Sequence, residues 1–145
     1  MSYDIAVISF SPGGLFKAHW ALYAIETNGN STENWLIHVE GEPSSGFTHD
    51  IKKYDIAFSR RSHHVHSLLG GAHITASQLK GILDVATSIP APGKSLRSAS
   101  SAGRPQGRVR LENCQTWLTQ VVEGSIQQNY LPPEALTALH QVPMN

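Results

Sequence analysis

The single cysteine of this 145-residue chain, Cys114, lies where an extended stretch gives way to a helical pattern, in "RLENCQTWLTQ". Asn113 is a favoured N-cap residue, and Cys114 shares the apolar stripe of the predicted helix. A helix N-terminus presents unpaired N–H groups and a partial positive charge, which favour a thiolate over a thiol. Cys114 is therefore a candidate nucleophile, and its backbone N–H with Gln115 is a candidate oxyanion site. The alternative is a free cysteine that only packs in the core.

Two histidines are candidate partners of this thiol, because a cysteine nucleophile needs a nearby imidazole and a group that orients it. His19 lies in "KAHWALYA" and His38 in "WLIHVEG", both apolar stretches in which a polar ring needs a partner. Alternation along a strand places His19 and Trp20 on opposite faces. If the two stretches are neighbouring strands, the histidines stand side by side, and a helix lying across that face brings Cys114 to them. The alternative for each is a structural histidine whose hydrogen bonds are satisfied in the core.

The strands that carry these histidines are predicted from short runs rich in β-branched and aromatic residues. Asn28-Gly29-Asn30 is a strong turn sequence, so the runs on either side of it are expected to pair as an antiparallel hairpin. A Gly/Pro/Ser-rich stretch is expected to be irregular, at residues 41–50. The predicted strands are residues 5–10, 15–25, 34–39, 54–58 and 63–69, with a short extended segment at 109–111.

Three helices are predicted to pack on this sheet. The first begins at residues 75–77, where Thr and Ser can cap it, and ends before Pro90. The second runs from about Cys114 to Ser125, and the third covers 132–140, where two prolines suit the first turn. Residues 94–107 are rich in Ser and Gly and are interpreted as a flexible loop, which either covers a site or is a disordered insertion.

The composition, with 40% apolar residues, suits one domain, and 11 basic residues balance 11 acidic ones. This neutral balance gives no support for a nucleic-acid partner. The chain shows neither a secretory signal pattern nor an apolar stretch of the roughly 20 residues that a membrane span needs. A lone cysteine cannot form an internal disulfide. We therefore expect a cytoplasmic protein without a membrane span.

Four further histidines cluster in the sequence, at positions 63, 64, 66 and 73. Histidine is a common metal ligand. However, there is no second cysteine and no recognised metal-ligand spacing. A solvated, histidine-rich sheet edge is the favoured interpretation, with metal binding as the alternative, and no metal or cofactor is predicted.

The motifs "HWALY" on a strand, a second histidine on the next strand and "NCQ" at a helix start resemble the lecithin:retinol acyltransferase-like family. That family is a circularly permuted branch of the NlpC-type papain-like superfamily, in which the histidines precede the cysteine as they do here. The resemblance implies that Cys114 is the nucleophile, His19 the general base and His38 the third, orienting residue. It also implies an acyl-thioester on Cys114 that passes to water, an amine or another acceptor.

Residues 1–145 are thus expected to form a single α+β domain with a small, mostly antiparallel sheet and helices packed on it, of permuted papain-like type. The expected function is cysteine-dependent acyl transfer or hydrolysis of a small-molecule, lipid or peptide substrate with an ester, amide or thioester bond. The alternative is a non-catalytic ligand- or protein-binding domain that retains the same scaffold. The expected site residues are Cys114, His19 and His38 for catalysis and Gln115, Trp20 and Asn113 for the oxyanion or substrate.

Overall fold

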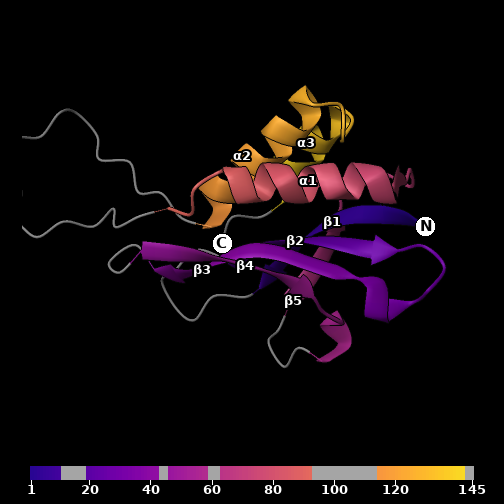
Figure 1. The fold of residues 1–145 in the computed structure, drawn as a ribbon, viewed down its shortest axis with the longest axis horizontal. Coiled ribbons are helices and arrows are strands. Elements are labelled where there is room, and N and C mark those ends of the chain that lie inside the picture. The colour runs from indigo at the N-terminus through magenta and orange to yellow at the C-terminus, as the bar shows by residue number, and fades with distance from the viewer. Residues whose placement is uncertain (11–18, 43–45, 59–62, 93–113, 143–145) are drawn as a thin grey trace, which may run out of the picture.

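The computed structural model describes residues 1–10, 19–42, 46–58, 63–92 and 114–142. Within them the helices lie against one face of an antiparallel sheet, so the α+β expectation is confirmed (Figure 1). The strand order is β4-β3-β2-β1-β5, and β6 also pairs with β1. The strands are β1 (Ser2–Phe10), β2 (His19–Glu26), β3 (Trp35–Glu42), β4 (Gly46–Lys53), β5 (His63–Ser67) and β6 (Ile74–Thr75).

The interior strand β1 is buried on both faces, which explains its mostly apolar run "IAVISF". Ile5 and Val7 belong to the larger core between the sheet and the helices. Ile8 and Phe10 belong to a second, smaller cluster on the opposite face. That smaller cluster is completed by Ala21, Tyr23 and Leu36 from β2 and β3. Both faces of the sheet are therefore buried near its centre.

The helices begin and end close to where their capping residues predict. In α1 (Ala76–Ser88), Thr75 and Gln78 form a capping box, with side chain to backbone distances of 3.1 and 2.8 Å. The second helix, α2 (Cys114–Gln127), starts at the cysteine itself. The third, α3 (Glu134–Leu139), is shorter than expected, because Pro132 and Pro133 precede its first turn. None of the described helices combines the length and apolarity needed to cross a bilayer.

Two expectations about strands are wrong. Residues 41–42 and 46–50 are not irregular, because they belong to β3 and to its hairpin partner β4. Gly41 has a φ of 141°, and a Cβ there would collide with the carbonyl oxygen of Gly46. Residues 54–58 are not a strand but contain the 3₁₀ helix η2 (Ile56–Phe58). Residues 11–18, 94–107 and 109–111, for which strands or a loop were expected, lie outside the described residues.

The buried Tyr23 hydroxyl holds the start of η2 on the face away from the helices. It donates a hydrogen bond to the Tyr54 carbonyl at 2.9 Å and accepts one from the Ile56 N–H at 3.0 Å. Tyr54 and Ile56 consequently pack against the smaller apolar cluster.

Gly81 in α1 is the closest point of contact between this helix and the connection that follows α2, because a Cβ there would collide with the ring of Tyr130. Alanine forms helices better than glycine by about 1 kcal/mol, but overpacking costs about 1–3 kcal/mol. We expect Gly81→Ala to lower the free energy of unfolding by about 1 kcal/mol, measured by urea denaturation. Gly124→Ala in α2 is the control, since its Cβ would meet only a methyl group of Val85, at 3.0 Å. If the two variants were equally stable, the contact with Tyr130 would not constrain this position.

Candidate functional site

A row of aromatic and ionisable side chains crosses the sheet on the face opposite the helices. Phe10 is the register partner of both His19 and His63, and His38 is the partner of Asp50. The ring centroids of Phe10 and His19 are 5.6 Å apart, and those of His19 and His38 are 5.0 Å apart. The row therefore joins His63, Phe10, His19, His38 and Asp50 across five strands.

Within this row, Asp50, His38 and His19 form a continuous hydrogen-bonded chain. His38 Nε2 lies 2.8 Å from Asp50 Oδ2, and His38 Nδ1 lies 2.8 Å from His19 Nε2. An ionised carboxylate only accepts, so His38 Nε2 must donate, and Nδ1 of a neutral His38 must accept. His19 Nε2 is then the donor to His38, and the acceptor lone pair of a neutral His19 is on Nδ1. The chain thus prepares Nδ1 of His19 to take up a proton.

Burial and charge favour the protonation states that this hydrogen-bonded chain requires. Burial lowers the pKa of His38 below its ordinary value, and the hydrogen bond with Asp50 opposes that shift only in part. Burial alone would raise the pKa of Asp50, but hydrogen bonds from Lys52 and His38 outweigh it and lower that pKa. Lys52 Nζ lies 3.0 Å from Asp50 Oδ2. His38 is therefore neutral and Asp50 ionised near neutral pH.

The thiol of Cys114 lies at the first residue of α2, only 7% exposed, in the core on the helix side of the sheet. Its Sγ accepts a hydrogen bond from the backbone N–H of Trp20, at a distance of 3.5 Å. Trp20 is also in this core, where its side chain is 4% exposed. The thiol therefore contacts β2 one residue beyond His19.

The thiol contacts β2 beyond the end of its printed pairing with β3. The Thr27 N–H donates to the Ser2 carbonyl of β1, so odd-numbered residues of β2 bond to β1 and even-numbered ones point towards β3. The pairing of β2 with β3 covers only residues 22–24 of β2 and 35–37 of β3. Beyond that point the Trp20 N–H meets the sulfur of Cys114 where a regular sheet would supply a β3 carbonyl.

The contact with the Trp20 amide brings the thiol close to the backbone of His19, although the two side chains come from opposite sides of the sheet. The Cα of His19 is two bonds from the Trp20 nitrogen, roughly 2.4 Å away, so Sγ lies within about 6 Å of that Cα. The ring of His19 directs Nε2 towards His38. Its other nitrogen, Nδ1, is the one nearer to its own backbone. The expectation that α2 lies across the histidine face is wrong, since α2 packs on the opposite face.

Of the two remaining expected site residues, the structure describes Gln115 but not Asn113. Gln115 is 2% exposed in the first turn of α2, and its carbonyl accepts a hydrogen bond from Thr119 Oγ1 at 2.8 Å. Asn113 lies outside the described residues. Asp50 was missed by the sequence analysis, because its stretch was expected to be irregular. The available indication was that Phe47 and Ile51 in "GFTHDIKK" would share one strand face, with Asp50 on the other.

Three of the four clustered histidines, His63, His64 and His66, lie on β5, an edge strand of the described sheet, whereas His73 precedes β6. His64 is exposed, and its ring centroid lies 6.4 Å from that of His66. Burial, and then the nearby His64, lower the pKa of His66. Among the described residues, these histidines do not belong to any group of three potential metal ligands, whereas His38, Glu40 and Asp50 do.

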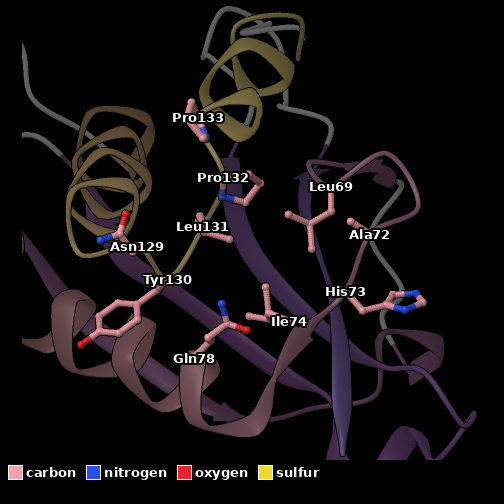
Figure 2. Close-up of a pocket in the computed structure, with 10 residues that line it drawn as sticks. All are labelled: Leu69, Ala72, His73, Ile74, Gln78, Asn129, Tyr130, Leu131, Pro132 and Pro133. Atoms are coloured by element: carbon pink, nitrogen blue, oxygen red, sulfur yellow. The ribbon is translucent and has the colours of Figure 1, made fainter.

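A separate pocket of about 390 Å³ lies beyond the C-terminal end of α2 (Figure 2). Ile74, Tyr130 and Leu131 are among the residues that line it, and the ring of His73 points away towards its rim. Because α2 rises roughly 20 Å from Cys114 to Gln127, this pocket is far from the thiol. It contributes no residue to the hydrogen-bonded chain.

Comparison with known proteins identifies one family model that matches residues 5–132, described as a family of unknown function (DUF6540). No curated protein and no solved structure matches the chain.

Proposed function

Because this chain belongs to DUF6540, whose members have no assigned function, we propose its function from the site itself: cysteine-dependent acyl transfer or hydrolysis through Cys114. The observation that carries this proposal is the hydrogen-bonded chain from Asp50 through His38 to His19, which begins where the thiol contacts β2. A thiol next to an imidazole that is itself oriented by further polar groups is the usual arrangement of a cysteine nucleophile.

The reaction begins when Nδ1 of His19 takes the proton of the Cys114 thiol. The thiolate attacks the carbonyl carbon of an ester, amide or thioester, and the resulting tetrahedral intermediate collapses to an acyl-thioester. The leaving group departs with the proton that His19 returns to it. Water or an acceptor amine then attacks the acyl-thioester, loses its proton to His19 and releases Cys114. His38 and Asp50 act as positioning residues, since they keep the lone pair of His19 on Nδ1.

The N-terminus of α2 supplies the electrostatic part of this mechanism. A helix N-terminus carries a partial positive charge, which favours both the thiolate and an oxyanion. We assign the support of the same oxyanion to Gln115, which is buried and next to Cys114 in the sequence.

We also propose that the scaffold is the permuted papain-like one implied by the resemblance to the lecithin:retinol acyltransferase-like family. Two features support this: the histidines lie on consecutive antiparallel strands, and the later cysteine opens a helix packed on the same sheet. The acyl substrates in question are small molecules, lipids or peptides. A non-catalytic binding domain on the same scaffold remains the alternative proposal.

The proposal is tested by the rate of Cys114 alkylation as a function of pH. An ordinary thiol titrates near pH 8.5, whereas a thiolate paired with an imidazolium reacts at much lower pH. We expect the wild type to keep a reactive plateau well below pH 8.5, and His19→Ala to lose it.

His64→Ala is the matched control, because His64 is exposed on the edge strand, and it should keep the wild-type profile. A single ordinary thiol titration in the wild type, indifferent to His19, would contradict catalysis and favour the binding domain.

A further inference from the structure

We propose that His38, Glu40 and Asp50 form a binding site for a divalent transition-metal ion, and that an ion bound there suppresses the reactivity of Cys114. The second half of this proposal rests on the proposed function, whereas the first half does not. Histidine and carboxylates are suitable ligands for zinc, and three protein ligands leave a fourth position for water.

The separations of the ligand atoms fit such an ion. His38 Nε2 lies 2.8 Å from Asp50 Oδ2 and 3.7 Å from Glu40 Oε1, and the three atoms all lie within 4.8 Å of one another. Nitrogen and oxygen ligands at about 2.0–2.2 Å from a tetrahedral zinc ion are roughly 3.3 Å apart. The distances from His38 Nε2 to the two carboxylate oxygens lie on either side of that value, so small side-chain movements suffice to admit the ion.

The sheet holds these ligands in place and leaves the site accessible. His38 and Glu40 are two residues apart on β3 and therefore share a face, and Asp50 is the register partner of His38 on β4. The His38 side chain is 4% exposed, but those of Asp50 and Glu40 are 26% and 61% exposed. An ion can therefore arrive from solvent and reach a buried imidazole.

The charges around the site also favour a cation. Two carboxylates are balanced by one nearby ammonium group, that of Lys52, which is 48% exposed and contacts Asp50. Its long side chain can turn away into solvent when an ion approaches.

Metal binding reverses the direction of the hydrogen bond between His38 and His19. An ion on Nε2 of His38 requires the lone pair of that nitrogen, so the proton of His38 moves to Nδ1. Nδ1 then donates to Nε2 of His19, and the proton of His19 moves to its own Nδ1. Both rings stay neutral and no proton is lost overall, but Nδ1 of His19 can no longer take up the thiol proton. An ion at the Asp50 end of the hydrogen-bonded chain thus removes the proton arrangement that activates the thiol.

Isothermal titration of zinc chloride into the full chain tests the site without reference to activity. We expect one ion per chain in the wild type, a loss of affinity on the order of 10-fold or more in Glu40→Gln, and undiminished binding in Cys114→Ala and His64→Gln. Absence of binding in the wild type would overturn the proposal. So would binding that is lost in Cys114→Ala but kept in Glu40→Gln, because zinc would then be held by the thiol.

Alkylation of Cys114 at pH 6 tests the coupling, with each protein compared with itself in zinc and in a chelator. We expect zinc to slow the wild type about 10-fold or more and Glu40→Gln far less. Equal slowing of the two proteins would overturn the proposed coupling. An ordinary thiol in chelator with intact zinc titration would contradict the proposed function alone, whereas an activated thiol without zinc binding would contradict the metal site alone.

Discussion

Replacing Trp117 with alanine should lower the free energy of unfolding by about 3–5 kcal/mol, a large share of the stability of a small domain. Trp117 is 1% exposed and lies in the core between α2 and the sheet. Its indole N–H donates to the Ile89 carbonyl at 3.0 Å, and its ring centroid lies 5.7 Å from that of His49. The substitution therefore removes a hydrogen bond and leaves a cavity next to the helix turn that carries Cys114.

The matched control for this substitution is Trp35→Ala. Trp35 is only partly buried at the start of β3, with Lys53 Nζ 5.8 Å from the centre of its ring. We expect a loss of about 1–2 kcal/mol there, in proportion to the smaller area that it buries. Urea denaturation monitored by far-UV circular dichroism gives both values. Equal losses in the two variants would mean that the contact of α2 with the sheet does not depend on Trp117.

Replacing Asp50 with asparagine should reduce the rate of Cys114 alkylation at pH 6 by about 10- to 100-fold. The side-chain amide of asparagine can donate to His38 Nε2 as well as accept from it, so it no longer enforces a single proton arrangement. Most of the molecules are then expected to carry the proton of His19 on Nδ1, where it blocks uptake of the thiol proton. The pH profile of alkylation checks this result, because the plateau at low pH should fall while the rate above pH 9 stays unchanged.

Two further variants separate positioning from a general effect of charge. Asp50→Glu keeps a carboxylate and should restore part of the low-pH rate. Lys52→Gln removes the ammonium group that contacts Asp50 but leaves the acceptor of His38 in place, so its rate should stay within about 3-fold of the wild type. A wild-type profile in Asp50→Asn would show that Asp50 does not orient the histidines.

Much of the fold was predictable because its main elements carry strong local patterns. The mostly apolar run of β1 indicates a strand buried on both faces, and Asn28-Gly29-Asn30 marks the β2–β3 turn. Thr75 and Gln78 mark the start of α1, and Pro90 follows its end. The strand β4 was not predicted, because an edge strand exposed to solvent needs few apolar residues. Asp50 was lost with it.

The sequence by itself determined which residues can do chemistry: a lone cysteine at a helix start and two histidines on paired strands. Only the tertiary structure decided how they meet. The alternation in "HWALYA" places apolar residues on both faces of β2, so local periodicity cannot tell which face α2 covers. In the structure α2 packs on the face opposite the histidines. The first turn of α2 then brings the sulfur of Cys114 to the Trp20 amide, 94 residues away in the sequence. Such a contact between residues far apart in the chain is encoded by no short sequence pattern.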